Sequence, residues 1–218
     1  MIRLLLAYLL TLPAMAGAAT IAGRDLAGQN LICGPGSTAN NSIPCYPDDV
    51  LSGVFTNVGL FQINAGTTVF VTPAIPLIIF ASTISIPGTL NGSGRGEVGG
   101  IGGDPGQPGG DGAGRGPGIG ADTDMGGGGG AYCGDGGNGS GTNNVLGAGG
   151  AAYDDTAQPV STGSISPGSG GGGGGGASPQ TGGSGGQGGA SVYLEASSFT
   201  LTGTISVRGV PGGNSTKP

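Results

Sequence analysis

One block of this 218-residue chain is so poor in side chains that it restricts the folds open to the whole protein. Residues 92–190 hold 43 of the 56 glycines. Ordering a residue costs roughly 1–2 kcal/mol in conformational entropy, and glycine loses the most. The block has few apolar side chains whose burial could offset that cost. Two states therefore compete: a flexible coil, or an ordered backbone packed against other backbone.

The spacing of the glycines favours the ordered state. Glycine stands at every third position from Gly100 to Gly112, and 182–190 consists of three Gly-Gly-X triplets. A polyproline-II-type helix has three residues per turn, so bare faces let neighbouring helices approach and hydrogen-bond. Two bare faces out of three suit 182–190 to the interior of a bundle. Strict every-third glycine lasts too briefly for collagen, and we expect a polyglycine-II bundle.

The sequences that flank the glycine block indicate strands. Residues 50–91 are rich in Val, Ile, Phe and Thr and are interrupted by Gly and Pro, a pattern typical of short strands. Helical periodicity is absent. Bulky residues within the block, at 121–125, 142–146 and 153–156, fall at intervals suited to turns between straight runs.

An internal repeat links the two flanks of the block. Shifted by 115 residues without a gap, 77–94 lies over 192–209, so that Ala81 meets Ala196 and Ile84 meets Phe199. Self-similarity of this kind marks stacked structural units. With period two, one face of the returning strand carries Phe199, Leu201, Ile205 and Val207, and the other carries Thr200, Thr202, Thr204 and Ser206.

These observations define a fold class and a set of boundaries. We expect an all-β protein in which short β-solenoid or sandwich rungs carry an inserted polyglycine-II helix bundle, with essentially no α-helix in the mature chain. The predicted segments are 1–18, a signal peptide; 19–49, an irregular N-terminal segment with a disulfide; 50–91, β-rungs; 92–190, the glycine-rich block; and 191–218, a returning β-rung and tail.

The first residues predict export. Arg3 gives a positive start, 4–12 an apolar core, and Ala16-Gly17-Ala18 a small-residue cleavage site. The apolar core is shorter than the roughly 20 residues that span a bilayer. Cleavage is expected after Ala18 or, in a second register, after Ala16, which makes the protein secreted or bound to the cell surface, with no membrane span after removal of the leader.

Charge excludes two classes of partner. The whole chain has twelve acidic residues and six basic ones, of which Arg3 leaves with the leader. The remaining bases are scattered, and no basic cluster could follow a phosphate backbone or an anionic membrane surface. We expect no nucleic-acid partner.

Three cysteines occur in this exported chain. Cys33 and Cys45 lie twelve residues apart in loop-like sequence, which favours a local disulfide in an oxidising compartment. Cys133 is left over, and the sequence leaves two readings open: an intermolecular disulfide or a free thiol.

No catalytic set, metal site or cofactor motif is found. The chain has no histidine, which excludes Ser-His-Asp and Cys-His catalysis and His-metal sites. The acidic pairs Asp122/Asp124 and Asp154/Asp155 stand in turn-like breaks, where aspartate is common for turn formation. We predict a non-enzymatic protein, with Tyr132 and Tyr153 as candidate binding-loop residues.

The sequence resembles glycine-rich secreted or surface proteins of bacteria, in its STISIPGTLNGSGRG stretch, its glycine block and its GGASVYLEASSFTLTGTISVRG return. The block is also similar to the glycine-rich domain of phage long-tail-fibre tip adhesins and to glycine-rich snow flea antifreeze proteins, both of which stack polyglycine-II helices. The likeness covers about residues 60–213 and implies no functional residue.

Three functions follow from this combination. The first is an extracellular structural protein that assembles with copies of itself into a fibre, sheath or matrix, because unpaired strand edges template polymerisation. The second is an adhesin whose loops near Tyr132 and Tyr153 touch a cell-surface glycan or receptor. The third is ice binding through Thr200, Thr202 and Thr204 or a flat glycine face.

Overall fold

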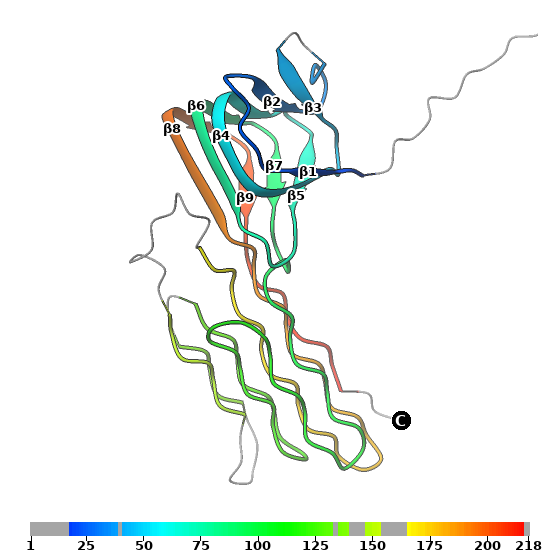
Figure 1. Ribbon diagram of the computed structural model, residues 1–218. Coiled ribbons are helices and arrows are strands. Elements are labelled where there is room, and N and C mark those ends of the chain that lie inside the picture. The colour runs from blue at the N-terminus through cyan, green and yellow to red at the C-terminus, as the bar shows by residue number, and fades with distance from the viewer. Residues whose placement is uncertain (1–17, 39–40, 133–134, 140–146, 154–164, 216–218) are drawn as a thin grey trace, which may run out of the picture.

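A computed structural model describes residues 18–38, 41–132, 135–139, 147–153 and 165–215 of the chain. Strands gather at one end of the molecule, and the glycine-rich block extends away from them as wavy, extended runs (Figure 1). The described residues contain no helix, which confirms the prediction of an all-β chain. The strands are β1 (Thr20–Ala22), β2 (Asn30–Cys33), β3 (Ser42–Cys45), β4 (Val50–Ile63), β5 (Thr68–Val71), β6 (Leu77–Ile86), β7 (Thr89–Asn91), β8 (Val192–Leu201) and β9 (Thr204–Ser206).

All pairings between these strands are parallel, and they form two stacks that share β4. One stack has the order β1–β4–β5–β7–β9, and the other has the order β3–β2–β4–β6–β8. The 14-residue β4 serves both because Val50–Ser52 pair with β1 and β5, whereas the strand pairs with β6 from Gly53 onward. Within the part that pairs with β6, the register shifts between Phe55 and Val58, where Asn57 adopts a positive φ of 51°. Such a shift bends the strand and redirects its second half.

The core consists of apolar residues that lie opposite one another from strand to strand. Leu31 of β2 pairs with Phe61 of β4, Phe61 pairs with Ile84 of β6, and all three are fully buried. In the other stack, Val69 and Leu90 are buried in the same way. Each such side chain contributes about 1.5–3 kcal/mol relative to an exposed position, so the stacked rows hold the strands in register.

The glycine block is an insertion between β7 of one stack and β8 of the other. Thr68 pairs with Thr89, 21 residues later, whereas Thr89 pairs with Thr204, 115 residues later. The same shift of 115 relates Leu77 to Val192 and continues through the whole of β6 and β8. The sequence repeat is therefore confirmed as strand pairing, and the two ends of the block meet, since the N–H of Ala190 donates to the carbonyl of Gly92 at 2.9 Å.

The segment 19–49, predicted to be irregular, contains three short strands. β1 pairs with the start of β4, and β2 pairs with both its end and β3. Gly, Pro, Asn and Ser interrupt the strand pattern here. β1 and β2 form because β4 offers them a partner, and β3 then pairs with β2. Local sequence preference is a weak guide where tertiary pairing supplies the hydrogen bonds.

One run, residues 168–176, lies at the centre of the glycine block. Three successive N–H groups of this run donate to three different neighbouring runs, and the rotation then starts again. Gly171 donates to the carbonyl of Gly186 at 2.9 Å, Gly172 to that of Gly128 at 2.8 Å, and Gly173 to that of Gly110 at 2.8 Å. The rotation repeats at 174, 175 and 176. Three residues per turn is the period of a polyglycine-II helix.

Two further runs donate to the central run. Gly100 and Gly103 give their N–H groups to the carbonyls of Gly171 and Gly174, and Ala121 gives its own to that of Gly173. The five hydrogen-bonded neighbours of 168–176 in the described chain are thus 96–104, 107–113, 116–122, 125–132 and 182–190. The block is an ordered backbone lattice, as the glycine spacing predicts.

Candidate functional sites

Tyr132 and Tyr153, the two predicted binding-loop residues, lie together near the strand end of the glycine block. Their rings meet edge to face, with centroids 5.3 Å apart and planes at 87°, and the N–H of Tyr153 donates to the carbonyl of Tyr132 at 2.8 Å. The guanidinium of Arg115 lies 5.3 Å from the centre of the Tyr153 ring. Aromatic pairs and cation–π contacts of this geometry stabilise local structure.

The two tyrosines differ in what they offer a ligand. The Tyr153 hydroxyl donates to the carbonyl of Pro167 and accepts a hydrogen bond from the hydroxyl of Ser169 at 3.0 Å. Ser169 in turn accepts from the N–H of Gly116 at 3.0 Å. The hydroxyl of Tyr153 is therefore used in hydrogen bonds that connect three runs of the block. The side chain of Tyr132, in contrast, is 38% exposed to solvent. Their role in ligand binding stays a prediction.

The Cys33–Cys45 disulfide predicted from spacing is present in the structure. The two cysteines lie opposite each other in β2 and β3, their Cα atoms are 4.2 Å apart, and both are fully buried. The bond ties β3 to the stack. Cys133 lies outside the described residues, as do Asp154 and Asp155.

The other acidic pair has a turn role in the structure. A carboxylate oxygen of Asp122 accepts the N–H of Thr123 at 2.7 Å, and its carbonyl accepts the N–H of Met125 at 3.1 Å. Asp124 follows with a positive φ of 64°. Across the described part of the chain, no three His, Cys, Asp or Glu side chains are grouped so as to hold a metal ion.

The C-terminal end of both stacks is an open strand edge. Among the described strands, β8 pairs with β6 alone, and β9 pairs with β7 alone. Phe199 and Leu201 of β8 are 46% and 47% exposed, although their partners Ile84 and Ile86 are fully buried. The described chain places nothing over these two side chains.

The threonine row predicted for ice binding does not lie on one strand. Thr200 belongs to β8, Thr204 belongs to β9, and the chain bends at 202–203 between them. The prediction that 199–207 forms one alternating strand is wrong, because the chain passes from one stack to the other at this bend. All three threonines are exposed, but no single flat row is formed.

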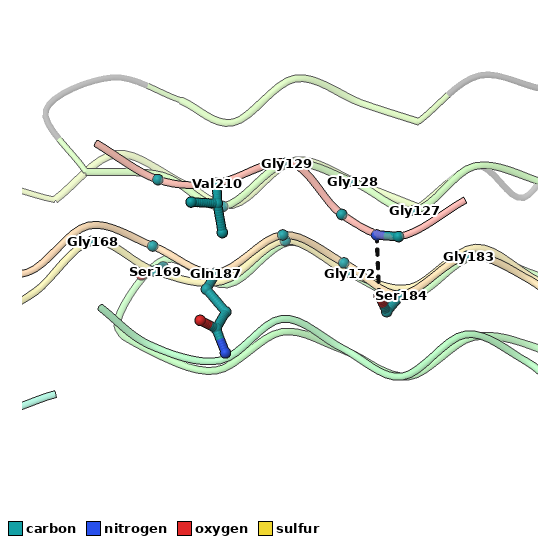
Figure 2. A pocket seen from close by; sticks show the side chains of 18 of the residues that line it. Gly127, Gly128, Gly129, Gly168, Ser169, Gly172, Gly183, Ser184, Gln187 and Val210 are labelled. Atoms are coloured by element: carbon teal, nitrogen blue, oxygen red, sulfur yellow. Dashed lines mark hydrogen bonds between the residues drawn. The ribbon is translucent and has the colours of Figure 1, made fainter. Parts of the chain in front are cut away.

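A groove of about 1180 Å³ runs along the glycine block beside the central run. Its walls come from 124–132, 168–175, 182–190 and the C-terminal run 207–213. Figure 2 shows the runs that carry Gly127–Gly129, Gly172 and Gly183, with few side chains between them. The N–H of Gly213 donates to the hydroxyl of Ser184 at 3.1 Å, which attaches the C-terminal run to its neighbour.

Sequence reasoning did not identify this groove. Its walls are mostly glycine, and the residues that form its floor lie in an unbroken glycine run, 170–176, which has no triplet pattern to mark an exposed face. Only the hydrogen-bond directions between runs distinguish a covered face from an open one.

Comparisons with known proteins give no match: no family model, curated protein or solved structure is significantly similar to this chain. Within the described residues, no helix is long and apolar enough to cross a membrane.

Proposed function

We propose that this protein is an extracellular structural protein that assembles with copies of itself into a fibre, sheath or matrix. The observation that carries the proposal is the open end of the stacks at β8 and β9. Among the described residues, nothing pairs with the outer edge of the ten-residue β8, and its last apolar residues, Phe199 and Leu201, stay half-exposed. Long, apolar, exposed edges template further strand pairing.

The opposite end of the stacks offers a parallel partner. The outer strands there are β3 and β1, so a second copy stacked head to tail brings its β3 beside β8 and its β1 beside β9. A head-to-tail contact that does not close on itself gives an open filament. Pro44 removes one N–H donor from β3, so hydrophobic contact with Phe199 and Leu201 carries much of the interface.

Other features support an extracellular role. The N-terminal residues have the layout of a secretory leader, and the Cys33–Cys45 disulfide suits an oxidising compartment. The chain has few charged residues for its length, so few of them are available to block edge-to-edge association.

Sedimentation velocity and electron microscopy of the exported protein test the proposal. We expect concentration-dependent oligomers and regular filaments from the native chain, and monomers from the variant Phe199→Lys/Leu201→Lys. Ile101→Lys is the matched control, since Ile101 is 77% exposed on the glycine block and away from the edge. A native chain that stays monomeric at high concentration contradicts the proposal.

A further inference from the structure

The groove along the glycine block is a position in its backbone lattice that no described run fills. A polyglycine-II helix in a hexagonal bundle has six neighbours, and the central run 168–176 has five in the described chain. Runs 125–132 and 182–190 are each bonded to the central run, and the groove separates these two. The groove therefore occupies the sixth position.

The space beside each glycine of the central run indicates the same opening. A Cβ added at Gly172 or Gly173 would collide with the carbonyl oxygens of Ile119 or Ile101. A Cβ added at Gly171 would meet nothing closer than 3.2 Å, the carbonyl oxygen of Gly128, with the nitrogen of Gly186 at 3.6 Å. Gly168 and Gly174, one turn away on either side, have similar space at 3.1 and 3.3 Å. One face in three of the central run is therefore less closely packed than the other two.

The groove also contains backbone groups that have no partner among the described residues. In the central run, carbonyls at 170, 171, 173 and 174 accept N–H groups from neighbouring runs, whereas those of Ser169, Gly172 and Gly175 accept none from the described residues. On the walls, the N–H groups of five glycines donate to no described residue: Gly127, Gly130, Gly183, Gly186 and Gly189. Unpaired backbone groups at a three-residue spacing form a ladder of acceptors on the floor and donors on both walls.

We propose that this groove binds one extended polypeptide with a Gly-Gly-X repeat in the polyglycine-II conformation, supplied by a separate partner chain. A chain parallel to the central run donates one N–H per turn to the carbonyls of Ser169, Gly172 and Gly175. Its own carbonyls accept from the glycines of the two walls. No ion or small sugar presents donors and acceptors at this repeat of about 9.3 Å, three residues at 3.1 Å each.

The Gly-Gly-X requirement follows from a run that already occupies an equivalent position. Run 96–104 lies beside the central run with one side open, and its glycines 99 and 102 touch carbonyls of 182–190 while glycines 100 and 103 touch those of 107–113. Its third positions point outward, so Val98 is 57% and Ile101 is 77% exposed. A chain in the groove faces two walls in the same way and needs two glycines in each triplet.

NMR titration of the labelled protein with the peptide acetyl-(Gly-Gly-Ser)₃-amide tests the proposal. The Phe199→Lys/Leu201→Lys variant is the background, because it leaves the groove intact and keeps edge assembly out of the measurement. We expect shifts in the amide signals of Gly183, Gly186 and Gly189, and binding at least about tenfold weaker for acetyl-(Gly-Ala-Ser)₃-amide, whose methyl groups would collide with the walls.

Two substitutions separate blocking of the groove from damage to the fold. Gly171→Ala places a methyl group in the open space and is expected to abolish peptide binding while the amide spectrum stays native. Gly137→Ala is the matched control, since no atom lies within 4 Å of the added Cβ and Gly137 does not line the groove.

Three results would overturn the proposal. Equal binding of both peptides would remove the glycine requirement, and no shift at millimolar peptide would remove the site. Protection of the same amides in the protein alone, lost on dilution, would assign the groove to a second copy. None of these results bears on assembly through β8, so the two proposals fail independently.

Discussion

Ile84 and Phe199 lie directly opposite each other in β6 and β8, yet Ile84 is fully buried and Phe199 is 46% exposed. The difference comes from their places in one row of side chains. Leu31, Phe61 and Ile84 each have a strand on both sides, whereas Phe199 has a neighbour on one side only. Equivalent positions in the repeat therefore contribute different amounts to the free energy of unfolding.

We expect Ile84→Ala and Phe199→Ala to differ in their effect on stability. Removing the buried Ile84 side chain leaves a cavity and costs about 2–5 kcal/mol in the free energy of unfolding. Phe199→Ala removes a larger side chain but leaves no enclosed cavity, and should cost about 1 kcal/mol or less in the monomer. Denaturant unfolding of the monomeric protein measures both, and equal losses would contradict the open-edge assignment.

The disulfide should stabilise the N-terminal end of the stack. Its loop spans a separation of 12 residues, for which the chain-entropy model gives about 3 kcal/mol. Replacing both cysteines by alanine, in a Cys133→Ser background to prevent exchange, should lower the free energy of unfolding by about that amount. Of the strands that the structure describes, only β2 pairs with β3, so amide exchange at Ile43 should accelerate more than exchange at Ile84. Uniform acceleration would instead indicate one cooperative unit.

Tyr193 gives a pH-dependent signal on β8. Its hydroxyl donates to a carboxylate oxygen of Glu195 at 2.9 Å. This hydrogen bond is the main cause that raises the pKa of Tyr193 above its ordinary value of 10.0, with burial and the negative charge of Glu195 adding to it. The protonated phenol is the form favoured by folding, so the contribution is present below pH 10 and is lost as the pH rises through the raised pKa.

Glu195→Gln should therefore lower the pKa of Tyr193 toward its ordinary value. The neutral amide oxygen accepts a weaker hydrogen bond than the carboxylate does, and the negative charge is gone. NMR titration of the Tyr193 ring reports the change, and Tyr46, which lies elsewhere, is the internal reference. A pKa that does not move would show that the Glu195 charge has no effect on the phenol.

The pairing of β6 with β8 could be predicted from sequence because parallel strands in register place like residues opposite one another. Ala81 opposite Ala196 and Leu90 opposite Ile205 are the same pairs in sequence and structure. The exposure of Phe199 could not be predicted, since the repeat that aligns it with Ile84 does not mark where the stack ends. Whether the stacks are best called a solenoid or a sandwich stays a prediction.

The glycine block was predictable in kind but not in arrangement. Triplets at 99–104 and 182–190 indicate bare faces, and both runs pack against the central run. The 182–190 run was expected inside the bundle, but Ser184 and Gln187 are exposed, and the centre is 168–176. A run of consecutive glycines has no side chain to distinguish its faces, so its neighbours follow from tertiary hydrogen bonds alone.

Two consecutive glycines of the central run give the sharpest test of this lattice. A Cβ at Gly172 would collide with the carbonyl of Ile119, part of the backbone of a run fixed by its own hydrogen bonds. Since backbone cannot give way as a side chain can, Gly172→Ala should cost at least about 2 kcal/mol. Gly171→Ala, whose methyl group enters the groove and comes no closer than 3.2 Å to the carbonyl of Gly128, should cost clearly less. Hydrogen exchange at the amides of Gly173 and Gly174 measures both variants. In a flexible coil the two substitutions would be equivalent, so equal exchange rates would exclude the packed arrangement, whereas fast exchange in Gly172→Ala alone supports it.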